Sequence, residues 1–270
     1  MELGVDGRFE ATLPRDTEVL FHVRDAASGH EDHPPRGGDY RLSSDYPEAW
    51  LEKGTFFDVD PRSLGFELID AHTHPYARAD DGGFVFAPAA LLATERQEGI
   101  GVALTTCEGT LEFQRTNLLR LCRAEPWLVP LLWVEPLRDS AEQVEALLAE
   151  GFRGLKFHPT ASGYPADGEA MDAFLALAER RRVPVQVHTA IDDNACARRF
   201  AALARRFPGV ELVMVHTELG AGDKSSPLAL VRGLPNVYVE LSWANPESVL
   251  QAMSVLDSSR TLFGVRPAQL

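Results

Sequence analysis

Short apolar runs alternate with segments of helical periodicity from Phe66 to the end of the chain. The predicted strands cover residues 66–72, 101–106, 128–134, 154–157, 183–188, 212–216, 237–241 and 261–263. The predicted helices cover residues 88–98, 111–124, 140–150, 168–182, 193–206, 226–233 and 246–256. Each apolar run is brief and almost wholly apolar, as expected for strands covered on both faces. Eight strands that alternate with helices in this way predict a (β/α)8 TIM barrel.

The helix starts and the end of the chain refine this prediction. Ser140 and the pair Asp192-Asp193 are capping residues that mark the expected starts of the third and fifth helices. An open, doubly wound sheet is the alternative, but no glycine-rich phosphate loop follows the first strand. Only seven residues follow Phe263, so the barrel is expected to lack its last helix.

Residues 1–65 have a different pattern. They are rich in turn residues, as in the segment His33–Gly38, and their apolar pieces are short. Residues 1–66 also contain 14 acidic and 7 basic side chains, a net charge of −7. We therefore predict two parts, an N-terminal β-rich extension at 1–65 and the barrel at 66–270. The extension would cover the barrel bottom, form a dimer contact or reach over the mouth.

The acidic balance limits the partners of the chain. Its 26 Lys and Arg against 40 Asp and Glu give a net charge of −14 over 270 residues. A basic nucleic-acid-binding surface is therefore not expected, and neither is an anionic membrane as a partner. The expected partner is a small-molecule substrate, and the sequence leaves open whether the chain forms a homo-oligomer.

The sequence also favours a cytoplasmic location. The longest apolar runs, such as Trp127–Val134, are far shorter than the ~20 residues of a membrane span. The first residues have neither a basic nor an apolar region of a secretory signal. Cys107, Cys122 and Cys196 are an odd number without close spacing, which is typical of free thiols in a reducing compartment.

Histidines gather where the predicted strands end. The carboxyl ends of barrel strands form the mouth where (β/α)8 enzymes place their chemistry. Residues at these ends are His72 and His74 after the first strand, Lys156 and His158 after the fourth, His188 after the fifth and His216 after the sixth. Strand side chains alternate between faces, so His72 shares a face with His74, and Lys156 shares one with His158. By the same alternation, His216 is expected to point inward together with Leu212 and Met214.

This clustering predicts a metal site. Imidazole nitrogen is a common ligand of Zn²⁺ and related divalent ions, and two or three histidines with a carboxylate leave a position open for water. His72 and His74 would supply two ligands from one strand, and His188 and His216 would supply more from across the mouth. Such an ion lowers the pKa of bound water towards ~7 and polarises a carbonyl group.

The barrel region, about residues 66–268, resembles the amidohydrolase superfamily, and within it the amidohydrolase-related group of metal-dependent hydrolases. The matching motifs are Leu68–Pro75, Gly151–Pro159, Pro184–Thr189, Val213–His216 and Val237–Ser242. The resemblance implies that His72, His74 and His188 bind a divalent metal, usually zinc, with manganese or iron as alternatives. It implies that His216 is a further ligand or a hydrogen-bond donor to substrate or bound water.

The chain departs from the family pattern at its last strand. The family strand normally ends in Phe-Gly-Ser/Thr-Asp, whose Asp binds metal and moves the proton of the attacking water. Here Arg266 stands where that Asp is expected. A guanidinium has no lone pair for a cation. Either the activity is weak or absent, or the chain end is truncated or altered, or another carboxylate substitutes, for which Glu240 and Glu218 are the candidates.

Lys156 has two interpretations. In two-metal relatives a lysine at the end of the fourth strand is carbamylated and bridges both ions, so the resemblance permits that role here. The favoured alternative is an amine that binds an anionic group of the substrate or pairs with an acid such as Asp70. Neighbouring His158 would donate to the substrate or fill the mouth.

Together these features predict a metal-dependent hydrolase that activates water for attack on an amide, lactone or ester. His216, Lys156, His158 and Glu240 are the predicted catalytic residues, and Glu240 is a substitute for the absent proton-transfer group. Two alternatives remain, a metal-dependent non-oxidative decarboxylase of an acidic substrate and a catalytically degenerate barrel that only binds a metal or a partner.

Overall fold

The computed structural model describes residues 67–78, 84–97, 99–221, 224–244, 246–256 and 258–264, together with six short strands before residue 44. The chain divides into two compact units, Met1–Leu64 and Gly65–Leu270. The described strands of the first unit pair antiparallel: β1 (Glu2–Leu3) with β2 (Phe9–Glu10), β3 (Glu18–Phe21) with β6 (Tyr40–Ser43), and β4 (Val23–Arg24) with β5 (Glu31–Asp32).

The second unit is the predicted barrel. Eight parallel strands form one sheet in chain order: β7 (Leu68–Thr73), β10 (Ile100–Thr105), β11 (Leu128–Trp133), β12 (Gly154–Phe157), β13 (Val185–Ala190), β14 (Leu212–Leu219), β15 (Val237–Glu240) and β16 (Thr261–Leu262). The Ala71 N–H donates to the carbonyl of Phe263, which follows β16, over 2.8 Å. This hydrogen bond joins the last strand to the first, so the ring of strands is nearly closed.

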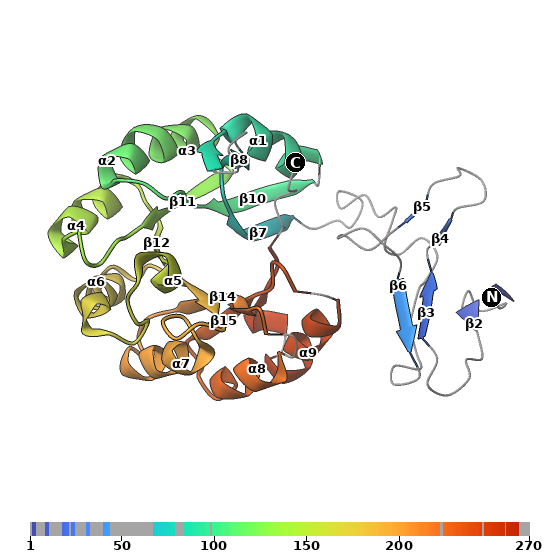
Figure 1. Ribbon diagram of the computed structural model, residues 1–270. Helices are drawn as coiled ribbons and strands as arrows, with labels where there is room; N and C mark the ends of the chain where they lie inside the picture. Colours follow the sequence, from blue (N-terminus) through green and yellow to red (C-terminus); the bar gives the residue numbers. More distant parts are fainter. Residues whose placement is uncertain are drawn as a thin grey trace. The chain divides into compact units, whose positions relative to one another are not determined.

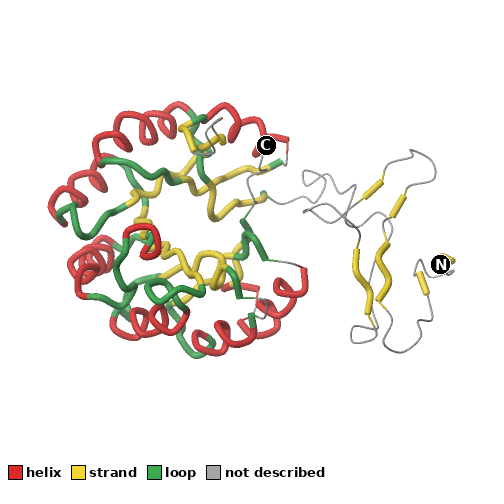
Figure 2. Tube along the Cα trace, in the orientation of Figure 1, coloured by secondary structure: helices red, strands yellow, loops and turns green. Residues whose placement is uncertain are grey.

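Helices surround the ring of strands (Figures 1 and 2). They are α1 (Pro88–Gln97), α2 (Leu111–Phe113) continued by a π-helical segment (Gln114–Leu119) and α3 (Arg120–Ala124), α4 (Ala141–Glu150), α5 (Pro159–Ser162), α6 (Asp172–Arg181), α7 (Ala197–Arg206), α8 (Ser225–Val231) and α9 (Pro246–Leu256). A short antiparallel hairpin, β8 (Tyr76–Arg78) and β9 (Phe84–Phe86), precedes α1. Short 3₁₀ turns lie at Glu169–Met171 and Ser258–Arg260. None of the helices in the described part is long and apolar enough to cross a membrane.

The helix caps show where local sequence signals succeed. Ser140 starts α4 as predicted, because its side chain accepts from the Gln143 N–H while the Gln143 side chain accepts from the Ser140 N–H. The predicted start of α7 at Asp192-Asp193 is wrong. Asp192 Oδ1 accepts from the backbone N–H groups of Asn194 and Ala195, and this forms a turn instead of a helix. The helix begins four residues later, at Ala197.

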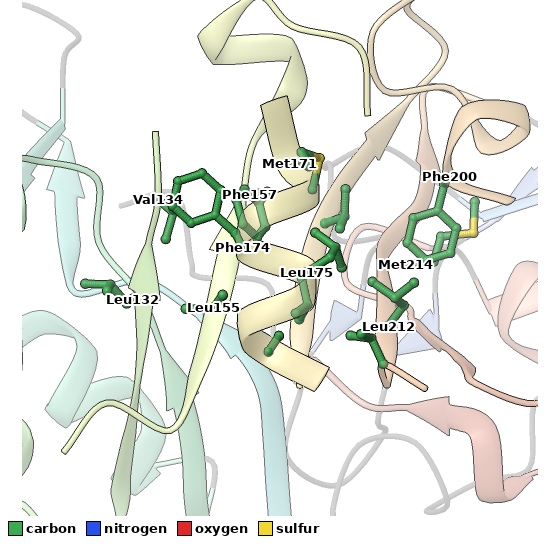
Figure 3. Packing of buried hydrophobic residues seen from close by; sticks show 14 of the residues in the cluster. Leu132, Val134, Leu155, Phe157, Met171, Phe174, Leu175, Phe200, Leu212 and Met214 are labelled. Carbon is green, nitrogen blue, oxygen red and sulfur yellow. The ribbon is translucent and has the colours of Figure 1, made fainter. Parts of the chain in front are cut away.

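The hydrophobic core lies between the strands and the helices. Alternate strand residues face outward into it, and Figure 3 shows Phe157 beside Phe174 of α6 and Met214 near Phe200 of α7. The rings of Phe157 and Phe174 are 6.0 Å apart between centroids. The intervening residues of the same strands face the barrel interior. Because Leu155 and Phe157 occupy the outer face, Lys156 between them is directed inward.

Candidate metal centre

The first strand brings two imidazoles together at the mouth. Nε2 of His72 lies 3.1 Å from Nε2 of His74. His72 is buried and His74 is partly buried, and their rings are 4.7 Å apart and nearly perpendicular. The prediction that these two histidines share a face is therefore confirmed.

The hydrogen-bond partners of Nδ1 fix the tautomer of both rings. His74 Nδ1 lies 2.9 Å from the carbonyl of Thr106, which only accepts, so this nitrogen has the hydrogen. His72 Nδ1 lies 2.8 Å from Oε1 of Gln186. The Gln186 amide is itself oriented, because its Nε2 donates to the Ala71 carbonyl over 2.6 Å. Both imidazoles therefore have a lone pair on Nε2.

Two facing lone pairs at 3.1 Å repel each other unless a cation lies between them. Two nitrogen ligands at tetrahedral zinc distances would be about 3.3 Å apart. The His72 and His74 pair thus fits a divalent metal by chemistry and by spacing. Gln186 and the Thr106 carbonyl hold the ligands in the way that outer partners hold metal-binding histidines.

His216 is held by a chain of hydrogen bonds that ends at Glu240. The Ser242 hydroxyl lies 3.0 Å from Glu240 Oε2 and 2.8 Å from His216 Nδ1. When its single hydrogen is donated to the carboxylate, Ser242 accepts from the His216 ring. The Nε2 atom of His216 then has a lone pair, as in His72 and His74.

Glu240 is wholly buried and its carboxylate accepts three hydrogen bonds. It accepts from the backbone N–H of His216 over 3.1 Å and from the N–H and hydroxyl of Ser242 over 2.5 Å and 3.0 Å. Burial raises its pKa, while these donors and the nearby charge of Lys156 act in the opposite direction. The carboxylate orients its neighbours and has no exposed surface for water.

The backbone at the end of β14 is left-handed over three residues. The φ angles of His216, Thr217 and Glu218 are 66°, 47° and 62°. This is a strained conformation for residues with a side chain, above all for the β-branched Thr217. The segment is held by the bond from His216 N–H to Glu240, by the Thr217 hydroxyl donating to the Glu240 carbonyl, and by the Glu218 N–H donating to Thr189 Oγ1.

The prediction that Leu212, Met214 and His216 all point into the barrel is wrong for the first two residues. The side chains of Leu212 and Met214 face the hydrophobic core between the strands and the helices, near Phe200 (Figure 3). They do not point into the barrel interior as predicted. A regular strand would have directed His216 outward with them. The left-handed turn places the His216 ring 5.2 Å from that of His72 and 5.1 Å from that of His188.

His188 is held by a stack of rings. It lies 3.8 Å from the His158 ring at an angle of 14°, and His158 lies 5.3 Å from Trp133 at 26°. The backbone of Trp133 is fixed by buried Gln114, whose side chain accepts from the Trp133 N–H over 2.7 Å and donates to its carbonyl over 2.8 Å. Gln114 begins the π-helical segment, a local feature that often accompanies functional sites.

His158 has the opposite tautomer to the first pair. Its Nδ1 accepts from the backbone N–H of Ala161 over 3.1 Å, which caps the short helix α5. A backbone N–H only donates, so the hydrogen of the neutral His158 ring is on Nε2. His158 is therefore a hydrogen-bond donor at the mouth, because its Nδ1 lone pair already accepts from the Ala161 N–H.

The four predicted ligands lie side by side, but only one pair is at ligand spacing. Within the described residues, no group of three His, Cys, Asp or Glu side chains is arranged to hold a metal ion as it stands. His72 and His74 are in contact through their Nε2 atoms, the His216 ring lies 5.2 Å from that of His72, and the His188 ring lies 5.1 Å from that of His216.

Burial keeps this cluster neutral. Burial, followed by the charge of Lys156, lowers the pKa of His74 from 6.5 to about 4 and that of His158 to about 3. The pKa values of His72, His188 and His216 are lowered for the same two reasons, burial first. Neutral imidazole is the form that binds metals.

The amine of Lys156 is buried on the interior side of β12. Its residue is 1% exposed, and Nζ has no hydrogen-bond partner among the residues that the structure describes. It therefore does not form the predicted pair with Asp70, whose Oδ1 accepts from the His72 N–H. Burial lowers the pKa of Lys156, and the negative charge of Glu240 partly opposes this shift.

The other candidate residues lie apart from the cluster or outside the described residues. Arg266 lies outside them. Glu218 accepts from the Ala197 N–H and so caps α7. Cys107 is completely buried, and burial raises its pKa to about 12, which is typical of an unreactive thiol.

Three buried polar residues of this site are absent from the sequence prediction. Gln186 and Ser242 bind the histidine rings, and Gln114 fixes Trp133. Gln186 stands between Val185 and Val187 in β13, and a polar residue at an interior strand position is the signal that would have indicated it. Ser242 follows the end of β15 and had no such signal. Gln114 lies in a helix and had no such signal.

Comparison with known proteins places the barrel in a family. The family model of amidohydrolases matches residues 69–266. The chain belongs to the amidohydrolase family. Among curated proteins no sequence matches it. The family and its structural neighbours support an enzyme of the hydrolase or lyase type.

Solved structures share the fold at low sequence identity. A putative 2-pyrone-4,6-dicarboxylic acid hydrolase from Pseudomonas putida is 17% identical, with a TM-score of 0.55 over 73% of this chain and 81% of that one. A zinc-bound amidohydrolase from Burkholderia multivorans is 16% identical, with a TM-score of 0.55 over 74% and 84%. A 5-carboxyvanillate decarboxylase from Novosphingobium aromaticivorans, complexed with manganese and a nitrobenzoic acid, is 12% identical, with a TM-score of 0.55 over 76% and 88%.

Proposed function

We propose that this amidohydrolase is a metal-dependent hydrolase of an amide, lactone or ester. The observation that carries the proposal is the pair of Nε2 lone pairs of His72 and His74, which face each other at 3.1 Å and are held there by Gln186 and the Thr106 carbonyl. The zinc and manganese in two structural neighbours support a divalent metal here, and we expect zinc first.

The imidazoles at the mouth provide the ligands of this metal. His72 and His74 would hold it from the first strand, and His188 would complete the set from across the mouth, while the single free lone pair of His216 is kept for a proton. When bound, a divalent ion supplies a Lewis acid that polarises a carbonyl and lowers the pKa of water. The stack on His158 and Trp133 limits the orientation of the His188 ring.

In this proposal His216 accepts the proton that water releases at the mouth. The Ser242 hydroxyl holds its Nδ1–H, so its Nε2 accepts a hydrogen bond from a water at the mouth. A proton that arrives on His216 Nε2 leaves a positive ring whose Nδ1–H is linked through Ser242 to the carboxylate of Glu240. Glu240 thus stabilises the charged ring from a position that water does not reach. This assigns Glu240 to positioning His216 and not to direct contact with the substrate.

The remaining residues of the mouth bind the substrate. His158 offers an Nε2–H donor, and Lys156 offers its buried amine. The substrate is a small molecule, since the chain has a net charge of −14 and the site lies within the ring of strands. We also propose a cytoplasmic location for the protein.

Non-oxidative decarboxylation is the second candidate. The fold is shared with a 5-carboxyvanillate decarboxylase that is complexed with a nitrobenzoic acid, and the buried amine of Lys156 would favour an acidic substrate in this barrel. Release of CO₂ from aromatic acids separates this reaction from hydrolysis of lactones, esters or amides.

Elemental analysis of the purified chain tests the proposal directly. Wild-type protein is expected to contain stoichiometric zinc, manganese or iron, and His72→Ala and His74→Ala are expected to lose it. His30→Ala, in the N-terminal unit, is the matched control and should retain the metal. Metal content unchanged in both barrel variants would reject the ligand assignment. A chain that binds metal but hydrolyses no lactone, ester or amide and releases no CO₂ is a degenerate binding barrel.

A further inference from the structure

The amine of Lys156 is a buried donor group that makes no hydrogen bond to the described residues. An ammonium group has three hydrogens to donate, and a buried donor that makes no hydrogen bond destabilises the fold. Nζ makes none with the described residues, although the residue is 1% exposed. A group of this kind is explained when a bound ligand supplies the acceptor that the protein lacks.

The position of Lys156 directs this amine towards the histidine cluster. It lies on the interior face of β12, in register with Trp133 of β11 on one side and Gln186 of β13 on the other. Its positive charge lowers the pKa of His72, His74, His158, His188 and His216. The amine is therefore close to the same mouth where the proposed metal would lie.

A second donor follows on the same strand end. His158 lies two residues after Lys156, and its Nδ1 is occupied by the Ala161 N–H, so its Nε2 has a hydrogen to donate. Glu240 provides negative charge for Lys156 but no hydrogen bond to Nζ, since its oxygens bind Ser242 and the His216 N–H. Among the described residues, Lys156 and His158 thus give the end of β12 two side-chain donors, and no side-chain acceptor is bonded to Nζ.

We propose that Lys156 and His158 form a carboxylate subsite, so that the substrate is a carboxylic acid that also contains the bond to be cleaved. An ammonium and an imidazole N–H can each serve one oxygen of a carboxylate, and charge-assisted hydrogen bonds of this kind are the strong ones. The substrate class rests on the proposed function, whereas anion binding at Lys156 does not.

Lysine NMR tests the subsite without any assumption about the reaction. Lys53, Lys156 and Lys224 are the lysines of the chain, so labelled lysine gives a simple spectrum in which Lys156→Arg identifies the signal. Acetate is the probe and acetamide is its uncharged control, because both molecules are small and differ mainly in charge. Acetate is expected to shift the Lys156 signal saturably in metal-free and in zinc-loaded protein. Acetamide should not shift it, and the Lys224 signal should stay in place.

Two results would overturn the subsite. In one, acetate leaves the Lys156 signal unmoved or shifts all three lysine signals alike. In the other, Lys156→Met abolishes zinc binding, which would make the amine part of the metal centre. We expect Lys156→Met to fold with a higher melting temperature, because an unpartnered buried amine is replaced by an apolar chain, and to bind zinc as wild type does.

The substrate class has a separate test. On a matched pair of esters with and without a carboxylate, Lys156→Met should raise KM for the acid at least tenfold more than it raises KM for the neutral ester. Equal effects on both esters would refute the acidic substrate class. If wild type hydrolyses neither ester, the proposed function fails, while the acetate titration still decides whether Lys156 binds anions.

Discussion

The first and sixth strands bring histidines to the same mouth by different means. His72 and His74 come from the end of β7, where their backbone has no left-handed residue and the two rings meet because residues two apart share a face. His216 comes from β14 only because three residues in a row adopt positive φ. The first arrangement needs little more than a strand. The second needs Glu240 and Thr189 from neighbouring strands to hold a strained backbone.

Acidification should destabilise the fold through the whole histidine cluster, including the β7 side with His72 and His74 and the β14 side with His216. We expect this to be the largest effect. The folded pKa of His74 is about 4 and that of His158 about 3, against 6.5 when unfolded. The unfolded chain therefore binds more protons, and stability is lost as pH falls from 6.5 towards these values. Burial of Glu240 acts with the opposite sign, but it is one group against several histidines.

Thermal melting of metal-free protein between pH 7.5 and 4 measures this loss. The melting temperature of wild type should fall steadily below pH 6.5, and His74→Phe should reduce the slope because one buried imidazole is gone. A melting temperature that stays constant or rises on acidification would contradict the buried, neutral state of the cluster.

Glu240→Ala should damage the β14 side most. It leaves the N–H groups of His216 and Ser242 without their acceptor beside a strained turn, and we expect a loss of about 3 kcal/mol of unfolding free energy. Glu240→Gln keeps the shape and one acceptor oxygen, so its loss should be about half as large. Chemical denaturation of both variants measures the difference. Equal stability of Glu240→Ala and wild type would show that the turn does not depend on this carboxylate.

Gln186→Leu should affect the β7 side chiefly through the metal. The His72 ring would lose the partner that fixes its tautomer, and metal affinity should fall about 10–100-fold. Competition with a metal-binding dye measures the affinity. Gln143→Leu, at the cap of α4, is the matched control and should bind metal as wild type does. An unchanged affinity in Gln186→Leu would separate His72 from the metal.

Ser242→Ala should have the smallest effect of these changes. The His216 ring loses one hydrogen bond, worth about 1 kcal/mol, while Glu240 still holds the His216 backbone. We expect a fall in kcat of about fivefold with KM unchanged, because the proton-accepting ring is less well oriented. Ser254→Ala, on the outer surface of α9, is the control. A large loss of zinc in Ser242→Ala would instead make His216 a principal ligand.

The sequence alone determined the barrel, because eight apolar runs separated by amphipathic segments have few other ways to bury their surface. It also determined that His72 and His74 share a face, since that depends only on the two-residue repeat of an extended strand. The resemblance to amidohydrolases rests on motifs of this local kind, and the match over residues 69–266 confirms the family.

Only the tertiary structure decided how the rest of the site is assembled. Gln186 meets His72 across the barrel, and Glu240 meets His216 from the next strand, so neither contact is visible in the residues around them. The inward direction of His216 depends on a left-handed backbone whose strain is offset by those distant hydrogen bonds. Periodicity predicts the face of a side chain in a regular strand, and it fails where long-range contacts stabilise an irregular one.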